Sequence, residues 1–236
     1  MIPKIIHYCW FGRNPLPISA QKCIDSWRRF LPDYEIKEWN EDNFNVNIIP
    51  YTQQAYEAKK YAFVSDYARF WILYHYGGLY FDTDVEVIKP YEDILDKGAF
   101  MGLEKDGTLK DTKIAINPGL GLGAEAGIAI YYEIINGFAS LEFYDISGKR
   151  NNYSMIPMVT SMFLQRGLRA NGKIQQLCGI TIYPQRFFNP YNSITGSLQK
   201  TPETHSIHWY SASWMGKKAL WFNKIKRIIK KLLVHG

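Results

Sequence analysis

Two kinds of hydrophobic pattern alternate along the first half of the chain. Short apolar runs bounded by polar residues are typical of strands, and longer segments with apolar positions every three to four residues are typical of helices. Ser65 is expected to cap a helix that ends at Gly77 and Gly78. Alternating strands and helices predict an α/β fold. The predicted strands are Ile2–Trp10, Tyr34–Trp39, Leu79–Phe81, Val85–Ile88, Phe100–Leu103 and Ile180–Tyr183, with a further apolar stretch at Ile114–Ile116, and the predicted helices are Ser19–Phe30, Gln53–Lys60, Ser65–Tyr76, Glu125–Gly137 and Met158–Gln165.

The last twenty residues follow a different pattern. Residues 217–236 hold seven Lys or Arg and no Asp or Glu, and their apolar residues recur at helical spacing from Trp221 to Leu233. A basic amphipathic helix of this kind favours an anionic membrane surface. The alternative is a terminal helix that packs on the body or on a second subunit. We therefore expect two parts, a body of residues 1–216 and a basic amphipathic helix of residues 217–236.

Composition limits what the body can do. The chain has 236 residues, 47% of them hydrophobic, which is enough for one large domain with a sizeable core. Without the seven basic residues of the tail, 21 Lys or Arg face 22 Asp or Glu, so a nucleic-acid-binding body is not indicated. The N-terminus lacks the pattern of a signal peptide, and no apolar run reaches the length of a spanning helix. The three cysteines, Cys9, Cys23 and Cys178, form no CxxC pair, which predicts free thiols in a reducing cytoplasm.

Two aspartates follow the predicted strand Leu79–Phe81. Asp82 and Asp84 stand one residue apart in the segment GGLYFDTDVEVIKP. In α/β sheets ligands bind beyond the carboxyl ends of strands, and residues i and i+2 of a strand point to the same side. Two carboxylates so placed suit Mg²⁺ or Mn²⁺, which would offset the cost of burying them. The alternative is an ordinary turn whose aspartates accept hydrogen bonds from backbone N–H groups.

The helix before these aspartates carries a further charged pair. Asp66 and Arg69 lie three residues apart and therefore on one face of the helix. The alternative is an exposed intrahelical ion pair of little energetic weight. The apolar and aromatic body of this helix, SDYARFWILYHYGG, favours a pair that faces the aspartates and binds a ligand.

Three segments together carry a family resemblance. The segment SDYARFWILYHYGGLYFDTDV at 65–85 resembles the hallmark of the family 32 glycosyltransferases with a DXD motif. The N-terminal IPKIIHYCWFG and the segment SIHWYSASW at 206–214 are similar to the first strand and the closing segment of that family. The resemblance implies a GT-A fold, a Rossmann-like mixed sheet flanked by helices. It also implies a divalent cation (Mn²⁺ or Mg²⁺), a UDP- or GDP-sugar donor, and transfer with retention of configuration.

The resemblance also implies roles for residues of the central motif. Asp84 would ligate the metal, and Asp82 would contact the ribose or sugar and reach the metal through water. Asp66 and Arg69 would hydrogen-bond the hydroxyls of the donor sugar. His208 would be a second contact to the metal or the diphosphate; in some relatives this place is taken by Asn or Glu.

Further roles concern the rim of the site. Trp10 would stack on the nucleobase, whereas its sequence context alone indicates a core residue. Trp214 would lie in a loop that closes over the donor. The NPGLGLG stretch at 117–123 lacks the features of a P-loop, but its Asn117 would contact the sugar. Ile156 replaces a glycine of the family pattern, which weakens any expectation of a close backbone approach to the acceptor.

The sequence thus predicts a metal-dependent retaining glycosyltransferase. It would build a bacterial surface polysaccharide on a saccharide acceptor carried by a lipid, in the cytoplasm and peripheral to the inner face of the cell membrane. One alternative is a Mg²⁺-dependent phosphotransferase or phosphohydrolase that uses the same aspartates. Another is a non-catalytic carbohydrate-binding module at a membrane surface.

Overall fold

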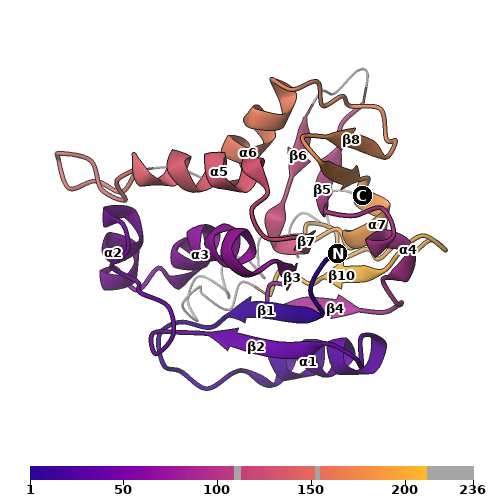
Figure 1. Cartoon of the computed structure of the whole chain (residues 1–236), viewed down its shortest axis with the longest axis horizontal. Coiled ribbons are helices and arrows are strands. Elements are labelled where there is room, and N and C mark those ends of the chain that lie inside the picture. Colours follow the sequence, from indigo (N-terminus) through magenta and orange to yellow (C-terminus); the bar gives the residue numbers. More distant parts are fainter. Residues whose placement is uncertain (109–112, 152–154, 212–236) are drawn as a thin grey trace, which may run out of the picture.

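The computed structural model describes residues 1–108, 113–151 and 155–211. Its centre is a mixed sheet with the strand order β2-β1-β3-β7-β5-β9-β8, to which β6 is added by pairing with β5 (Figure 1). A second sheet consists of β10 and β4. The elements are β1 (Ile5–Cys9), α1 (Ile18–Phe30), β2 (Glu35–Trp39), α2 (Pro50–Glu57), α3 (Tyr61–Tyr76), β3 (Gly78–Tyr80), β4 (Val85–Val87), α4 (Glu92–Leu95), β5 (Phe100–Asp106), β6 (Ile114–Ile116), the 3-10 turn η1 (Pro118–Leu120), β7 (Leu122–Ala124), α5 (Ala129–Ala139), α6 (Met155–Leu164), β8 (Gln175–Leu177), β9 (Ile180–Tyr183), α7 (Gln185–Phe188) and β10 (Ser206–His208).

The directions of the strands show which of them end at the same edge of the sheet. β1 runs parallel to β2 on one side and to β3 on the other, so the carboxyl ends of these strands share one edge. β7 runs antiparallel to both β3 and β5, which makes the sheet mixed. The predicted mixed α/β sheet is thereby confirmed.

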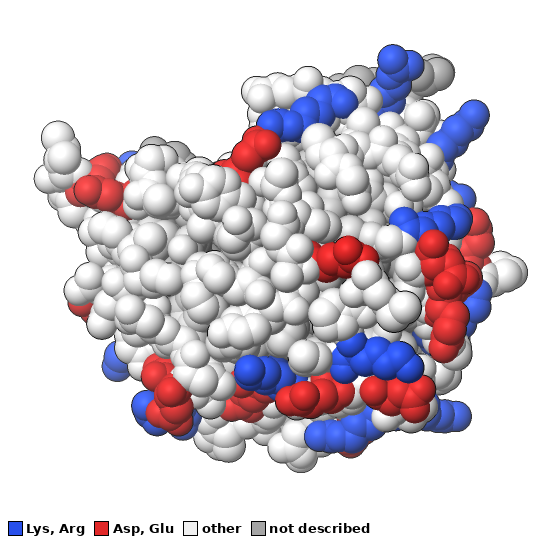
Figure 2. Space-filling model, in the orientation of Figure 1, with Lys and Arg blue, Asp and Glu red and all other residues white. Residues whose placement is uncertain are grey.

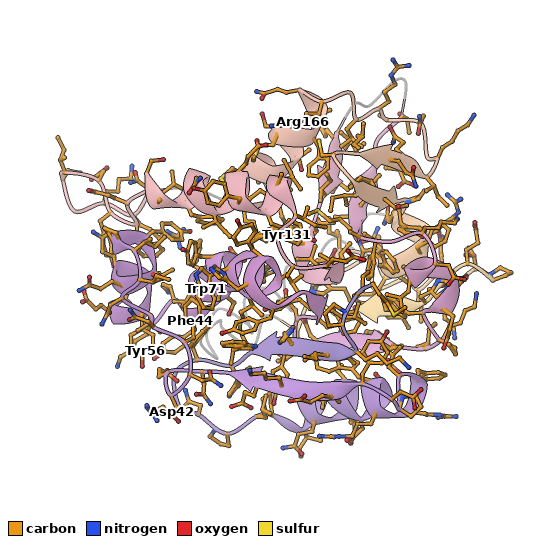
Figure 3. All side chains as sticks on the ribbon, viewed as in Figure 1. Asp42, Phe44, Tyr56, Trp71, Tyr131 and Arg166 are labelled. Carbon is orange, nitrogen blue, oxygen red and sulfur yellow. The ribbon has the colours of Figure 1, made fainter. Side chains whose placement is uncertain are left out.

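Each face of the sheet packs against its own helices. Phe70 of α3 and Tyr131 of α5 belong to one apolar cluster, with their ring centres 5.2 Å apart. Trp27 of α1 belongs to the cluster on the other face. In β3 the neighbours Leu79 and Tyr80 contribute to different clusters, as the alternation of a strand requires. Figure 3 shows Tyr131 at the junction of α5 and α3.

Helix α3 begins four residues earlier than the sequence predicted. It starts at Tyr61, and the Ser65 hydroxyl donates to the Tyr61 carbonyl at 3.2 Å inside the helix, so the prediction that Ser65 caps it was wrong. The predicted end is confirmed. Gly77 has φ +64°, and a Cβ on Gly78 would lie 2.7 Å from the Ile5 carbonyl oxygen, so glycine allows the chain to enter β3 there.

The remaining predicted elements occur with shifted ends, and several short ones were missed. The second helix starts at Pro50 instead of Gln53, because a proline fits the first helical position. The missed elements are three or four residues long and are held by tertiary pairing, so they leave no periodic signal in the sequence. They are α4, β7, β8, α7 and β10.

A buried histidine and the three cysteines have structural surroundings in the fold. The indole N–H of Trp39 donates to His7 Nδ1, and His7 Nε2 lies 3.0 Å from the Gly77 carbonyl oxygen. Burial lowers the pKa of His7 to about 4, so this histidine is a neutral core residue. All three cysteines are free thiols, as expected.

Charges of both signs are interspersed on the visible surface. Figure 2 shows blue and red side chains alternating along the lower and right edges of this face, around a broad centre that is mostly uncharged. This distribution agrees with a nearly neutral body. Among the described residues, no helix is long and apolar enough to cross a bilayer. The predicted amphipathic helix of residues 217–236 lies outside the described residues and stays a prediction.

Candidate active site

The two aspartates lie in a turn directly after β3. The Val85 backbone N–H donates to the Asp82 carbonyl at 3.0 Å, which closes a four-residue turn over Asp82–Val85. The expectation that both carboxylates share one side of a continuing strand was therefore wrong in its geometry. The turn nevertheless directs both toward one point, because it ends in β4, which pairs with β10 and places His208 opposite Val85.

Three side chains converge there as a candidate cation site. One ligand atom from each of Asp82, Asp84 and His208 lies within 4.8 Å of the other two. His208 Nε2 is 3.1 Å from Asp84 Oδ1, while His208 Nδ1 is buried without a hydrogen-bond partner among the described residues. Carboxylate oxygens suit Mg²⁺ or Mn²⁺, and the added imidazole favours Mn²⁺ because Mg²⁺ takes almost only oxygen ligands. These residues fit the divalent cation that the resemblance implies.

The surroundings of Asp84 favour its ionised carboxylate, the form that can bind a cation. Burial alone would raise its pKa, but His208, followed by the hydrogen bonds from Ser211, lowers the pKa to about 2. The backbone N–H and hydroxyl of Ser211 donate to Asp84 Oδ2 at 2.8 and 3.1 Å, leaving Oδ1 toward His208. Burial opposes a charge on His208, yet the adjacent Asp84 raises the His208 pKa. Sequence reasoning missed Ser211, although it lies within the segment that carried the resemblance.

Arg69 forms ion pairs with both Asp66 and Asp82. Its side chain is only 3% exposed and lies 2.9 Å from Asp66 Oδ1 and 3.3 Å from Asp82 Oδ1. Its Nε donates to the Ser65 carbonyl at 3.1 Å, and the Tyr80 hydroxyl donates to Asp82 at 3.1 Å. The pair is thus buried and faces the aspartates, as the sequence indicated, and the exposed ion pair is excluded. Because Arg69 is nearly enclosed, its most direct effect is to hold Asp66 and Asp82 in place.

Asp66 makes the stability of the metal-free protein depend on pH. Burial raises its pKa to about 6, against the lowering effect of Arg69. An acid whose pKa is higher in the folded state stabilises that state fully below the unfolded pKa near 4, and the contribution is lost as pH rises toward 6. We expect the free energy of unfolding to fall by about 2 kcal/mol between pH 4 and pH 6. Urea titrations should show a flatter curve for Asp66→Asn, and parallel curves for the two proteins would contradict the assignment.

The NPGLGLG stretch forms the wall behind Asp82. The Asn117 side chain accepts from the Gly119 backbone N–H at 2.8 Å and donates to Glu104 Oε2 at 2.8 Å, which fixes η1 beside the carboxylates. A Cβ on Gly119 would lie 2.3 Å from Asp82 Oδ2 and 3.2 Å from Arg69 Nη1. The stretch is therefore no phosphate cradle but a closely packed support, and Gly119 is a site residue that the sequence did not reveal.

Gly119→Ala should displace the Asp82 carboxylate, because the added methyl group needs the space that this carboxylate occupies. We expect a loss of about 1 to 3 kcal/mol in stability, typical of overpacking, and weaker Mn²⁺ binding. Urea unfolding and a Mn²⁺ titration measure both. Gly137→Ala is the matched control, since its Cβ would meet only Met158 Sδ at 3.6 Å within α5. Equal behaviour of the two variants would refute the close-packing argument.

A cavity of about 770 Å³ opens in front of these groups. It is large enough for a nucleotide sugar, since ligand pockets commonly span ~300–1,000 Å³. Trp10 lies on its wall, with the indole N–H donating to the Asn14 carbonyl at 2.6 Å. The structure thus brings together seven of the eight predicted site residues; the eighth, Trp214, lies outside the described residues. The lining includes Trp10, Asp66, Arg69, Asp82, Asp84, Asn117 and His208.

Comparisons with known proteins agree with this geometry. Residues 17–101 match the family described as "Glycosyltransferase sugar-binding region containing DXD motif". This stretch of the chain is thus similar to the sugar-binding region of the DXD glycosyltransferases. The matched region includes Asp66, Arg69, Asp82 and Asp84, so the family resemblance of the sequence is confirmed.

Two curated proteins are similar to this chain in sequence. The chain is 31% identical over 111 residues to inositol phosphoceramide mannosyltransferase 1 of Schizosaccharomyces pombe, covering 42% of this chain and 33% of that protein. It is 26% identical over 245 residues to mannosyl phosphorylinositol ceramide synthase SUR1 of Saccharomyces cerevisiae, covering 100% of this chain and 56% of that protein. The chain therefore spans about a third to a half of these curated relatives.

The fold itself resembles that of a known glycosyltransferase. A glycosyltransferase involved in the glycosylation of the major capsid of PBCV-1 superposes with a TM-score of 0.51 at 11% identity, covering 96% of this chain and 100% of that one. The described fold is thus GT-A-like.

Proposed function

We propose that this protein transfers a sugar from a nucleotide-sugar donor to a saccharide acceptor with retention of configuration. The observation that carries the proposal is the group formed by Asp82, Asp84 and His208 in a cavity at the carboxyl edge of β3. A cluster of two partly buried carboxylates and a buried imidazole is costly unless it binds something. The two carboxylates of this cluster lie in the segment that matches the DXD region, which connects their chemistry to sugar transfer.

The donor is assigned to the side of the cavity next to β1. Trp10 follows β1 and offers an aromatic face for a nucleobase, and the carboxylates follow the adjacent β3. A divalent cation bound by Asp84 and His208 would neutralise charge on the departing diphosphate. Asp66, with its side chain 19% exposed, is open to the donor sugar, while Arg69 fixes the carboxylate. Between them these groups orient the donor before the sugar–phosphate bond breaks.

The acceptor is assigned to the opposite side of β3. Strand β6 lies beyond β7 and β5 in the sheet, and α6 packs on it through the Thr160 hydroxyl, which accepts from the Ile116 backbone N–H. Met155 and Ile156 at the start of α6, together with Phe63 of α3, give the cavity an apolar wall there. An apolar wall suits an acceptor with apolar groups near the reacting sugar. The names of the relatives, which refer to inositol phosphoceramide, support an acceptor carried on a lipid.

A thermal-shift panel of UDP- and GDP-sugars, with and without Mn²⁺, tests the proposal. Ligand binding raises the apparent melting temperature by mass action, so the true donor should produce a shift that depends on Mn²⁺. GDP-mannose is tested first, because the relatives are named as mannosyltransferases. NMR of the released or transferred sugar then reports the anomeric configuration. An inverted product would overturn retention, and the absence of any Mn²⁺-dependent shift across the panel would overturn the proposed donor class.

The same assay separates the two alternatives from the sequence. A phosphotransferase or phosphohydrolase releases inorganic phosphate or moves a phosphoryl group, whereas a glycosyltransferase leaves an intact nucleoside diphosphate. A non-catalytic carbohydrate-binding module releases neither product. Product analysis by ion-exchange chromatography therefore decides among the three.

The cellular setting remains part of the proposal. We propose synthesis of a bacterial surface polysaccharide by an enzyme that sits on the cytoplasmic face of the cell membrane through residues 217–236. The support is the composition of this segment, with seven basic and no acidic residues. Co-sedimentation with anionic vesicles should retain the full chain and lose a shortened chain that ends at Ser213. Equal partitioning of the two chains would defeat the membrane role.

A further inference from the structure

The segment after β10 wraps around Asp84. His208 Nε2 lies 3.1 Å from Asp84 Oδ1, and the Trp209 backbone N–H donates to the Asp84 carbonyl at 2.9 Å. The Ser211 backbone N–H and hydroxyl both donate to Asp84 Oδ2. Of the four consecutive residues 208–211, Tyr210 alone makes no such contact with Asp84. Tyr210 instead differs from its neighbours in its backbone conformation and in the contact of its ring with His208.

The backbone of Tyr210 is left-handed. Its φ is +50°, a region that bulky residues seldom occupy and that costs about 1 kcal/mol or more. An extended residue here would continue the direction of β10 and carry Ser211 away from Asp84. The left-handed residue instead turns the chain back, so that the Ser211 N–H reaches the Asp84 carboxylate at 2.8 Å. Strain of this kind persists at sites where the surroundings require it.

The side chain of Tyr210 is held against His208. The two rings are perpendicular, with their centres 4.2 Å apart. The phenol group lies beside the side chain of Asn189, which is itself 2% exposed and donates to the Glu104 carbonyl at 3.1 Å. Asn189 is held by the fold and therefore restricts the positions open to the tyrosine ring. The ring supports the imidazole in the orientation that presents Nε2 to Asp84.

We propose that Tyr210 is a positioning residue of the cation site. Its left-handed backbone brings Ser211 to Asp84, and its ring orients the imidazole of His208. A glycine would adopt the same backbone without strain but would lose the ring, so a tyrosine at this strained position indicates that both contributions are used. The inference rests on the proposed function in that Asp84 and His208 bind a divalent cation, and it assigns to Tyr210 a role toward that cation.

Three variants of the full chain separate the two contributions. Mn²⁺ binding is measured by electron paramagnetic resonance, which reports free and bound Mn²⁺ without any need for activity. Tyr210→Phe keeps the ring and should bind within about 3-fold of the natural protein. Tyr210→Gly keeps the backbone turn but loses the ring, and Tyr210→Ala loses the ring and keeps the strain. Both should bind more weakly, by about 10-fold for Gly and up to about 100-fold for Ala, the range seen when a supporting residue of a metal site is removed.

Lys59→Ala is the control, because Lys59 is another left-handed residue, with φ +56°, and does not line the cavity. It should leave Mn²⁺ binding unchanged. Wild-type affinity in both Tyr210→Gly and Tyr210→Ala would overturn the inference, as would equal weakening by Lys59→Ala. Should Tyr210→Ala fail to fold, the comparison of Tyr210→Phe with Tyr210→Gly still tests whether the ring contributes to Mn²⁺ binding. A natural protein that binds Mn²⁺ but transfers no sugar would defeat the proposed function and leave the positioning role standing, whereas one that binds no Mn²⁺ would defeat both.

Discussion

Asp84→Asn should abolish the Mn²⁺-dependent part of donor binding and lower the transfer rate by about 10³-fold or more, since the leaving diphosphate would lose its electrostatic stabilisation. An amide is uncharged and binds a divalent cation far more weakly than a carboxylate does. The effect should exceed that of removing any supporting residue, because Asp84 is the carboxylate whose pKa, at about 2, keeps it ionised at every working pH. Thermal shifts with Mn²⁺ alone, with donor alone and with both measure the loss.

The control for this variant is Asp96→Asn, which changes an exposed aspartate at the end of α4 that does not line the cavity. It should respond to Mn²⁺ and donor as the natural protein does. If Asp84→Asn retains the full Mn²⁺-dependent shift, the assignment of the cation site is wrong.

Arg69→Met is expected to produce the largest loss of stability. It would leave two partly buried carboxylates, Asp66 and Asp82, beside each other without the guanidinium that pairs with both. Removing one partner of a fully buried ion pair costs about 3 to 5 kcal/mol, which sets the upper end of the expected loss. Urea unfolding without metal measures this loss at neutral pH. The loss should shrink at low pH, where both carboxylates are protonated and no longer need a cation.

The chain offers a matched control in Arg28→Met. Arg28 and Asp25 have the same spacing of three residues in a helix as Arg69 and Asp66, and their charged atoms lie 2.6 Å apart, but both side chains are more than 60% exposed. An exposed pair of this kind contributes about 1 kcal/mol or less. Similar losses in the two variants would show that burial does not set the energetics of the Arg69 pair. Restoration of stability in Arg69→Met by a further Asp66→Asn change would support the explanation.

The two variants test different functions of one group of side chains. Asp84 is held by Ser211 and His208 and lines the cavity, while Asp82 is held by Arg69 and Tyr80. The turn after β3 therefore presents one strongly ionised carboxylate and one whose pKa is raised by burial. The neighbouring carboxylates therefore have different surroundings, which agrees with the proposed division between cation binding by Asp84 and sugar binding by Asp66 and Asp82.

Residue pattern alone located the central part of the site. The segment 65–85 placed Asp66, Arg69, Asp82 and Asp84 between a helix and a strand, and all four lie together in the structure. Local pattern sufficed because these residues are within twenty positions of one another, on α3 and on the turn that directly follows β3.

The sequence by itself determined the α/β class, the carboxylate group and the family resemblance, because hydrophobic periodicity and a dense local motif depend only on neighbours along the chain. Only the tertiary structure decided that a turn, not a strand pleat, aims Asp82 and Asp84, that Gly119 packs against Asp82, and that Tyr210 turns Ser211 onto Asp84. The contacts of Gly119 and Ser211 with the two aspartates join residues that are far apart in the chain, up to 127 positions for Asp84 and Ser211. Their geometry depends on how β4 and β10 pair, and such pairing is set by the packing of the whole molecule and not by any local signal.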